Sequence, residues 1–324
     1  MSKALGLLSG GLDSSLAVMC LKRQGIDVTA IAFVTPFFGA GKARRAAERI
    51  GIPLLVRDIG DLHLEMVKHP RYGYGKNMNP CIDCHAMMFR IAGEIMREEG
   101  FDFLFSGEVL GQRPMSQNLS ALKAVANYSG HPDRILRPMS ARLLPVTPME
   151  EQGLVDRERL LDIQGRSRRR QEVLAREWGL ADYPSSGGGC LLTEKHFSDR
   201  LRDLITHEPD CSIDDVELLK VGRQFRLSPQ ARLAIGRNQE DNERLRELAG
   251  SAALLLRCVG FSGPLGVLSG QPGETDLTTA AAIVAGYGKG QAEPVVEVLA
   301  TGDDSQRTLS VTPCPLEKSR AWLL

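Results

Sequence analysis

Short apolar runs alternate with helical patterns through the first sixty residues of the chain. Residues 4–9, 28–34 and 53–59 are typical of buried strands, because each run is short and is bounded by glycine, proline or charged residues. Residues 15–25 and 42–51 lie between these runs, have a helical spacing of apolar positions, and each end at a glycine. Strands that alternate with helices of this length predict βαβ units and a parallel sheet with helices on both faces.

Two further segments extend the same pattern. Residues 85–100 carry a longer helical pattern, and residues 101–108 form a buried apolar run that ends in a polar turn. The predicted fold class is therefore α/β, with an open, doubly wound parallel sheet. Folds of this class bind their ligands outside the carboxyl ends of the strands, so we expect a site at that edge.

The second half of the chain follows a different pattern. Residues 156–180 are charged and helical with a break near Gly165, and a glycine-rich loop then leads to Cys190. This segment separates the expected sheet domain from the remainder of the chain. We expect three parts, at residues 1–165, 166–210 and 211–324.

The last of these parts mixes helical and β-like patterns. Residues 239–250 have the spacing of an amphipathic helix. Short β-like runs punctuated by glycine and proline lie at residues 253–260, 281–288 and 294–300. We therefore predict a separate, smaller α+β domain at the carboxyl-terminal end.

Composition and charge limit the class of protein. With 40 Lys and Arg against 40 Asp and Glu, the formal net charge is zero, which argues against a polybasic, histone-like protein. The apolar run at the amino terminus is short, and no later run reaches the roughly 18 apolar residues of a spanning helix. We therefore expect a cytoplasmic protein without a membrane partner.

A glycine-rich loop of sequence SGGLDSS, from Ser9 to Ser15, connects the first strand to the first helix. Glycines here permit a close approach of backbone N–H groups to an anion, at the positive end of the helix. Ser14 and Ser15 add hydroxyl donors, while Asp13 would repel phosphate unless it orients the loop or meets a metal ion that bridges phosphates. The pattern is neither a Walker A loop nor G-x-G-x-x-G, and an ordinary β–α turn with a capping serine is the alternative.

This loop matches the SGGxDS signature of PP-loop ATP pyrophosphatases, so the chain resembles that superfamily. Its members have an adenine nucleotide alpha-hydrolase-like fold, cleave ATP to AMP and pyrophosphate, and adenylate a carbonyl oxygen of the substrate. The resemblance implies bound ATP and Mg²⁺, with Asp13 as a catalytic residue. It assigns nucleotide contacts to Ser9, Gly10, Gly11, Asp13, Ser14, Ser15, Phe33 and Gly107.

The stretch NPCIDCH, residues 79–85, has two incompatible interpretations. Cys81, Cys84 and His85 form the C-x-x-C-H signature of covalent haem attachment, or the two cysteines belong to a metal or iron–sulfur site. Haem attachment belongs mainly to exported proteins, and the sequence shows no export signal. Seven cysteines, an odd number in such a chain, do not suggest a disulfide framework either. Haem would also leave Cys190 and the phosphate loop unexplained.

Three further motifs are similar to enzymes that thiolate tRNA. Residues 106–117, SGEVLGQRPMSQ, resemble the strand-end motif of bacterial tRNA 4-thiouridine synthetases. Residues 79–90 resemble the catalytic segment of tRNA 2-thiouridylases and align Cys84 with the catalytic cysteine. The stretch SSGGGCL, at 185–191, resembles their second cysteine segment and aligns Cys190 with the persulfide-carrying cysteine. The resemblance implies a tRNA thiouridine synthase with Cys84 and Cys190 as catalytic residues.

This resemblance leaves three interpretations of Cys81, Cys84 and Cys190. A structural zinc would need a fourth ligand, and the adjacent His85 should point elsewhere on a helix. Persulfide chemistry would use Cys84 and Cys190 and leave Cys81 without a role. A [4Fe–4S] cluster on all three thiolates, as in cluster-dependent tRNA thiolation enzymes, leaves one iron free to bind hydrosulfide. We favour the cluster, with inorganic sulfide or a cysteine desulfurase as the sulfur donor.

Arginine-rich segments suggest an RNA partner. Residues 221–226 and 234–238 resemble the RNA-binding region of NFACT proteins, and their arginines could contact phosphates while Phe225 stacks on a base. A basic run at 166–170 takes a family position near the tRNA acceptor stem. Solvated arginine faces would give the same patterns. The predicted RNA contacts are Arg113, Arg166, Arg223, Arg226 and Arg237.

Together, the motifs predict an enzyme that uses ATP to activate a uridine carbonyl of tRNA and replaces its oxygen with sulfur. The alternative is a PP-loop sulfur transferase or amidotransferase that acts on a small molecule or cofactor precursor. An amidotransferase would need an ammonia source, and the sequence contains no recognisable glutaminase nucleophile segment.

Overall fold

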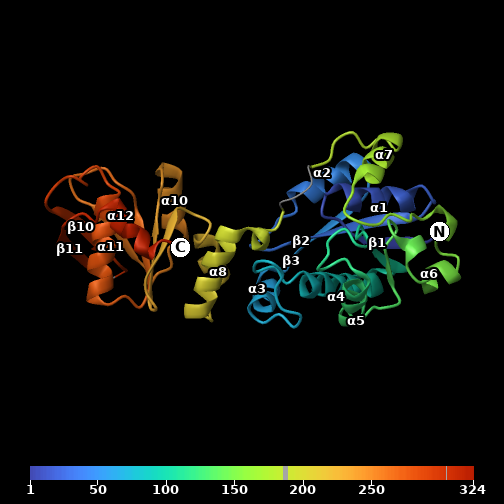
Figure 1. Cartoon of the computed structure of the whole chain (residues 1–324), viewed down its shortest axis with the longest axis horizontal. Helices are drawn as coiled ribbons and strands as arrows, with labels where there is room; N and C mark the ends of the chain where they lie inside the picture. Colours follow the sequence, from blue (N-terminus) through green and yellow to red (C-terminus); the bar gives the residue numbers. More distant parts are fainter. Residues whose placement is uncertain (185–188, 304) are drawn as a thin grey trace. The chain divides into compact units, whose positions relative to one another are not determined.

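The computed structural model describes residues 1–184, 189–303 and 305–324, and the chain divides into two compact units. Unit 1 is Met1–Thr193 and unit 2 is Glu194–Leu324. Figure 1 shows that helices and a sheet build each unit.

Unit 1 contains the parallel sheet that the sequence predicts. Five strands lie in the order β3-β2-β1-β4-β5, and every neighbouring pair is parallel. The strands are β1 (Lys3–Leu7), β2 (Asp27–Val34), β3 (Leu54–Asp58), β4 (Phe103–Ser106) and β5 (Ile135–Leu136). The strand order reverses between β1 and β4, so the crevice at their carboxyl ends is the expected place for a ligand.

Helices cover both faces of this sheet, because alternate strand residues point to opposite sides. On β2, Ala30 and Ala32 face one core cluster, and Ile31 and Phe33 face the other. The small alanines let three helices approach the first face, namely α1 (Leu12–Lys22), α2 (Gly41–Ile50) and α7 (Arg169–Glu177). The second face packs on α4 (Cys81–Glu99) and α5 (Leu119–Tyr128), near α3 (Gly60–Lys68). Figure 1 shows these two helical layers on either side of the sheet.

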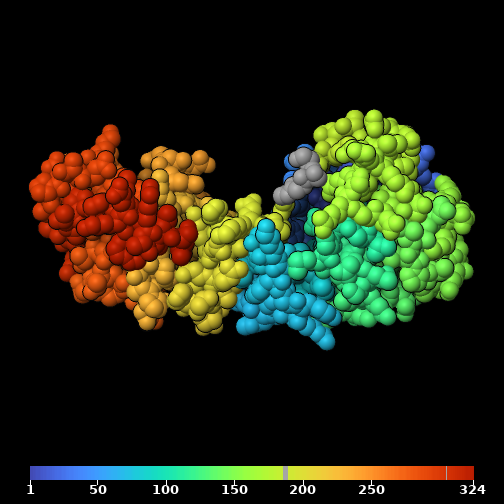
Figure 2. All heavy atoms as spheres, viewed as in Figure 1, coloured from blue at the N-terminus to red at the C-terminus, as the bar shows by residue number. Residues whose placement is uncertain are grey.

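The charged segment at 156–180 forms less helix than its pattern predicts. Only the short η2 (Arg157–Arg159) and α7 are helical, and the chain between them is irregular, with one isolated β-bridge from Gln164 to Leu110. There Ile163 N–H donates to the Met139 carbonyl at 2.9 Å, and Gly165 takes a positive φ of 82°. Pairing with distant backbone therefore overrides local helix propensity. In the space-filling view, the yellow-green segment containing α7 lies over the blue helices (Figure 2).

Short helical turns complete unit 1. They are η1 (Ala141–Leu143), α6 (Pro148–Glu151) and η3 (Leu191–Thr193).

Unit 2 is the smaller α+β domain that the sequence predicts. Its six-stranded sheet has the order β11-β10-β8-β9-β7-β6, and every neighbouring pair is antiparallel. The strands are β6 (Arg223–Ser228), β7 (Ala231–Ile235), β8 (Leu254–Cys258), β9 (Gly266–Gly270), β10 (Val296–Thr301) and β11 (Gln306–Val311). The helices are α8 (Lys195–His207), α9 (Ile213–Leu218), α10 (Gln239–Leu248), α11 (Glu274–Gly286), α12 (Leu316–Ser319) and η4 (Arg320–Trp322).

One predicted strand of unit 2 is wrong. The β-like run at 281–288 lies mostly in α11, whose buried residues include Leu277, Ala280, Ala281 and Val284. These positions have the i, i+3, i+4, i+7 spacing of one helix face, and that face packs against the sheet. The short apolar run is therefore the core-facing end of a longer helix. A run of this length is equally apolar in a buried helix and in a buried strand, so the sequence does not distinguish them.

The boundary between the units falls inside the expected middle part at 166–210. Helix α7 contacts α1 and belongs to unit 1, whereas α8 belongs to unit 2, where Asp203 pairs with Arg226. Long-range contacts therefore divide this segment between the two cores. Each helix in the described ranges is too short or too polar to cross a bilayer.

Candidate active site

The phosphate loop lies between β1 and α1, as the sequence predicts. Gly10 has a φ of 76°, and a Cβ atom there would lie 2.3 Å from the backbone carbonyl of Lys42 at the start of α2. Gly11 is the N-cap residue of α1, and the Ser14 hydroxyl donates to its carbonyl oxygen at 3.0 Å. The Ser9 and Ser14 hydroxyls are 3.2 Å apart. Backbone N–H groups and hydroxyls thus gather at the positive end of a helix, which is the geometry of an anion site.

The loop after β4 presses against this phosphate loop. A Cβ atom on Gly107 would lie 2.4 Å from the backbone nitrogen of Ser14, so a larger residue would push the loops apart. Ser15 is buried in the first turn of α1. The predicted residues Gly107, Ser14 and Ser15 therefore lie together at the crevice between β1 and β4.

Asp13 belongs to a polar network that joins three segments of the chain. Its Oδ2 atom accepts hydrogen bonds from Gln112 Nε2 at 2.7 Å and from Arg168 Nη2 at 3.1 Å. Gln171, which is fully buried, donates to the Gln112 side-chain oxygen at 3.0 Å. Asp13 Oδ1 is buried and has no hydrogen-bond partner within the described parts of the chain. The carboxylate is thus held by a cation on one oxygen and keeps the other for a cation or a donor.

Phe33 and Arg168 lie near the phosphate loop in ways that the sequence does not predict. Phe33 is 4% exposed and packs in a core cluster, so its side chain supports the sheet and only its backbone lies toward the edge. Arg168, which the sequence places in a basic run, instead pairs with Asp13. The role of Gln112 and Arg168 depends on contacts across 99 and 155 residues, so no local signal identifies it.

Cys81 and Cys84 occupy the first turn of α4. Their spacing of three residues places both thiols on one side of the helix start. Asn79 Nδ2 donates to Cys81 Sγ at 3.3 Å. Because α4 leads back to the start of β4, its first turn lies at the carboxyl edge of the sheet, where the phosphate loop also lies.

Cys190 is the third thiol at this place. Burial raises the pKa of the Cys84 thiol well above its usual value, and the neighbouring Cys190 and Cys81 thiols raise it further. The Cys190 segment is anchored by Leu191 N–H, which donates to the Phe37 carbonyl at 3.0 Å. Asn77 Nδ2 also donates to the Thr193 carbonyl at 2.6 Å. Residues 185–188 of the predicted motif lie outside the described residues.

His63 is a site residue that sequence reasoning missed. It is fully buried near the start of α3, and its Nε2 atom lies 3.3 Å from Cys84 Sγ. Burial lowers the pKa of His63 to about 4, so the ring is neutral near pH 7. The rings of Phe37 and Phe38 flank it, each with its centroid 5.4 Å away. A lone histidine in the apolar stretch Leu-His-Leu resembles an ordinary core residue, which is why the pattern gives no signal.

His85, which follows Cys84 in α4, contacts the buried ion pair of Glu108 and Arg137. His85 Nδ1 lies 2.8 Å from Glu108 Oε1, and Arg137 Nε donates to Glu108 Oε2 at 2.9 Å. Burial by itself would raise the pKa of Glu108, but Arg137 and His85 lower it to about 2. His85 therefore points to the loop after β4 and away from its neighbour Cys84. The sequence predicts this orientation.

The three thiols are a donor set suited to iron or zinc, since thiolate sulfur is the ligand both prefer. Within the described ranges, no group of three or more His, Cys, Asp or Glu side chains lies at metal-ligand spacing. Cys84 nevertheless interacts electrostatically with both Cys81 and Cys190. The donor types therefore suit a three-thiolate group, whereas the spacing of the described side chains does not form one.

The predicted RNA contacts differ in how accessible they are. Arg113 and Arg166 are exposed in unit 1. In unit 2, Arg223 lies over the Tyr287 ring at 4.9 Å, and Arg237 pairs with Asp241 at 2.7 Å. Arg226 is 10% exposed on its side chain and pairs with two carboxylates. Its internal pairs give Arg226 a structural function.

The prediction that Phe225 stacks on a base is wrong. Phe225 is fully buried in the core of unit 2 and packs edge-on against Tyr287, so its ring cannot stack on a base. The neighbouring Arg232 is 1% exposed and pairs with Asp215. Alternation along β6 and β7 turns these side chains inward, an orientation that the arginine pattern does not reveal.

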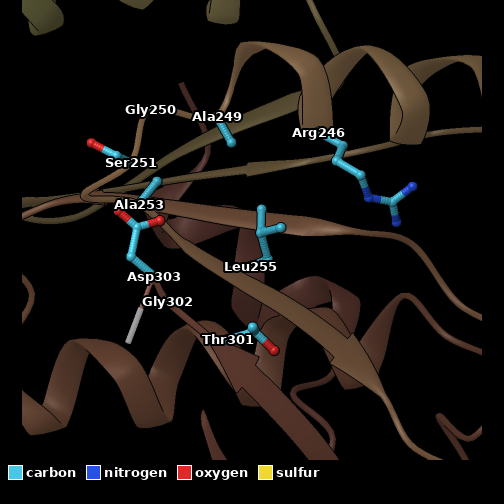
Figure 3. A pocket seen from close by; sticks show the side chains of 9 residues that line it. All are labelled: Arg246, Ala249, Gly250, Ser251, Ala253, Leu255, Thr301, Gly302 and Asp303. Atoms are coloured by element: carbon cyan, nitrogen blue, oxygen red, sulfur yellow. The ribbon is translucent and has the colours of Figure 1, made fainter. Parts of the chain in front are cut away.

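Unit 2 also contains a cavity of about 150 Å³. Figure 3 shows Arg246 and Asp303 at opposite ends of its lining, so one cation and one acid balance each other. Small side chains make up most of the remainder, including Ala249, Ser251 and Ala253. This lining has no arrangement that favours a particular ligand.

Two family models match separate parts of the chain. Residues 1–142 match the family described as thiamine biosynthesis protein (ThiI), and residues 222–323 match the NFACT protein RNA binding domain. The resemblance of the amino-terminal part to tRNA thiouridine synthases of the PP-loop type is thereby confirmed, and so is the resemblance of the carboxyl-terminal part to NFACT proteins.

Named proteins resemble parts of the chain. It is 31% identical to the tRNA-specific 2-thiouridylase MnmA of Methylobacterium nodulans over 214 residues, which cover 59% of this chain and 52% of that protein. It is 33% identical to a probable tRNA sulfurtransferase of Staphylococcus aureus over 148 residues, which cover 42% of this chain and 34% of that protein. A solved 4-thiouridine synthetase–RNA complex with bound ATP aligns over 67% of this chain and 52% of that chain, with 23% identity and a TM-score of 0.41. The chain thus spans about half the length, or less, of these curated relatives.

Proposed function

We propose that the chain is an ATP-dependent tRNA sulfurtransferase that replaces a uridine carbonyl oxygen with sulfur. The observation that carries this proposal is the convergence of a phosphate loop and three thiols at the carboxyl edge of one parallel sheet. The curated relatives named for tRNA thiolation support it. Neither a thiol site nor a phosphate loop alone would favour this reaction over others.

ATP binding falls to the phosphate loop. Backbone N–H groups at the start of α1 and the hydroxyls of Ser9 and Ser14 would hold the phosphates. Asp13 Oδ1, which lacks a partner among the described residues, would face the Mg²⁺ that bridges them. Arg168, held on the other oxygen of Asp13, would balance the charge of the carboxylate when the metal is absent.

The proposed reaction has two steps. First, the uridine carbonyl oxygen attacks the α-phosphorus of ATP, the bond to the β-phosphate oxygen breaks, and pyrophosphate leaves. Next, a sulfide attacks the activated carbon, the C–O bond breaks, and AMP leaves with the former carbonyl oxygen. The target base must leave its stack to reach the crevice between β1 and β4.

Cys81, Cys84 and Cys190 would supply the sulfur site. A [4Fe–4S] cluster held by these three thiolates would supply an open iron position for hydrosulfide. Zinc is the alternative, and His85 would not serve as its fourth ligand, because Glu108 holds that ring. His63 places a neutral N–H or nitrogen lone pair beside Cys84 Sγ and helps to fix that sulfur. The sulfur donor would be inorganic sulfide or a cysteine desulfurase.

An oxygen-18 experiment tests the adenylation step. Unmodified tRNA with oxygen-18 in its uridine carbonyls would be incubated with the full chain, ATP-Mg and sulfide, after anaerobic reconstitution with iron. The released AMP should carry one heavy oxygen for each sulfur incorporated, since the carbonyl oxygen leaves with AMP. AMP without the label would mean that water cleaves ATP, and the proposed function would be wrong.

A further inference from the structure

A groove of about 400 Å³ lies on unit 1, at the carboxyl-terminal ends of α1 and α2 and the turn after α7. Helix α1 begins at the phosphate loop, and its eleven residues place Lys22 roughly 16 Å from that loop. The groove is therefore distinct from the crevice between β1 and β4. Its lining consists of Met19, Lys22, Arg23, Arg49, Ile50, Trp178, Gly179 and Leu180.

The lining combines an apolar floor with cations. Of the described residues that line the groove, three are cationic and none is acidic. The Arg23 guanidinium lies over the Trp178 ring at 5.3 Å. The Lys22 ammonium donates to the carbonyls of Ile50 at 2.8 Å and Gly51 at 3.1 Å, which orient the charge without neutralising it. An aromatic ring beside cations fits a ligand with a flat base and a phosphate.

One acid reduces this charge. Arg49 pairs with Asp182, whose side chain is 81% exposed. Lys22 and Arg23 are exposed. Because an exposed ion pair contributes little, an incoming phosphate can compete with Asp182 for the guanidinium.

Cationic character continues along α2. This helix has the sequence GKARRAAERI, with Lys42, Arg44 and Arg45 exposed and Glu48 as its one acid. A row of cations along a helix fits the repeating charges of a nucleic-acid backbone better than a single phosphate. Together with the groove, it forms a cationic surface on the α1, α2 and α7 face of the sheet.

We propose that this groove binds the sugar–phosphate backbone of the substrate RNA, with a base or ribose against Trp178. The inference rests on the proposed function and adds a binding site for a part of the RNA away from the reacting uridine. A free nucleotide such as ATP could supply the same chemistry, and an acidic protein surface could match the charge. The row of cations on α2 favours RNA over both.

Binding of unmodified tRNA to the full chain tests the groove. The double variant Arg23→Ala/Arg49→Gln should weaken binding about tenfold near 0.15 M salt and lower the slope of log Kd against log salt by about two. Arg90→Ala removes an exposed arginine from α4, on the other face of the sheet, and should change the Kd less than about twofold. Equal effects of the two substitutions, or an unchanged salt slope, would overturn the proposal.

Trp178 provides a local probe, since Trp178 and Trp322 are the two tryptophans of the chain. In a Trp322→Phe background, tRNA should quench Trp178 fluorescence in a saturable way, and ATP alone should not. Quenching by ATP or by polyglutamate but not by tRNA would assign the groove to another ligand. If tRNA binds and is thiolated without quenching Trp178, the groove proposal fails and the proposed function stands. If wild-type protein binds no tRNA, both fail.

Discussion

The two units of this protein carry opposite net charge. Unit 1 has 25 Lys and Arg against 21 Asp and Glu, whereas unit 2 has 15 against 19. The match to the NFACT RNA binding domain lies within the acidic unit, and the match to the ThiI family lies within the basic one. Net charge by itself therefore favours a polyanion at unit 1 over unit 2.

The contrast extends to how each unit uses its arginines. In unit 2, Arg226 and Arg232 pair with Asp203, Glu208 and Asp215, and both are largely buried. In unit 1, the cations of α2 and the end of α1 are exposed. An arginine count along the sequence thus overstates the phosphate-binding capacity of unit 2, because internal acids already occupy several guanidinium groups.

The largest difference between the units should be in the effect of a cysteine substitution on the rate of tRNA thiolation. Cys84→Ala removes the half-buried thiol that lies beside His63 in unit 1 and should lower the rate of tRNA thiolation by at least about a thousandfold. Cys258→Ala, at a buried cysteine of unit 2, should leave that rate within about twofold. Thiouridine formation under single-turnover conditions measures both. Comparable losses from both variants would remove the assignment of the chemistry to unit 1.

Loss of a buried ion pair should destabilise unit 2 and spare unit 1. Arg226→Ala leaves Asp203 and Glu208 without their shared cation, which should cost about 3–5 kcal/mol in the free energy of unfolding. The exposed pair of Arg237 with Asp241 should be worth less than about 1 kcal/mol, so Arg237→Ala is the matched control.

Denaturant unfolding can monitor each unit separately. Fluorescence of Trp322 in unit 2 should shift to lower denaturant in Arg226→Ala, while that of Trp178 in unit 1 should stay unchanged. If both tryptophans shift together, the two units unfold cooperatively. If neither shifts, Arg226 is not a structural residue and is again a candidate for RNA contact.

The Glu108 ion pair gives unit 1 its own pH dependence. The pKa of Glu108 falls from 4.5 to about 2 on folding, so the unfolded chain binds more protons between these values. The resulting stability, at most about 3 kcal/mol, is fully present above pH 4.5 and is lost as pH falls toward 2. Unfolding of the metal-free protein followed by Trp178 should show this loss, and Glu108→Gln should flatten the curve in that window. An identical pH profile in the variant would contradict the assignment.

The smallest effect expected is at the phosphate loop. Asp13→Asn keeps the shape of the side chain but removes the charge that meets Mg²⁺, and it should lower tRNA-dependent release of pyrophosphate about tenfold to a hundredfold. Raised Mg²⁺ should partly restore the rate if the carboxylate contacts the metal. A variant with normal release at every Mg²⁺ concentration would limit Asp13 to orienting the loop.

Local chemistry explains which features the sequence predicts. The strands of unit 1 are short apolar runs bounded by glycine, proline or polar residues, and the phosphate loop requires glycine at Gly10, so both can be recognised from neighbouring residues. The antiparallel strands of unit 2 are harder to predict from the sequence. The run at 281–288 is ambiguous, because a buried helix end and a buried strand are equally apolar.

Long-range partners account for what the sequence cannot predict. His63 reaches Cys84 from 21 residues away, and Arg168 reaches Asp13 from 155 residues away. The partners of Arg226 likewise come from α8 and the turn after it. In each case the side chain has an ordinary polar or basic type, and its function follows from the residue that the fold places opposite it.

Mass spectrometry of nucleosides from unmodified tRNA tests the central claim most directly. The tRNA would be incubated anaerobically with the iron-reconstituted full chain, ATP-Mg and sulfide, beside the Cys84→Ala variant. The account predicts a uridine with one sulfur in place of one oxygen, formed with ATP by the wild type and lost in the variant. Cleavage of ATP without sulfur in any nucleoside would contradict tRNA thiolation and direct attention to a small-molecule substrate.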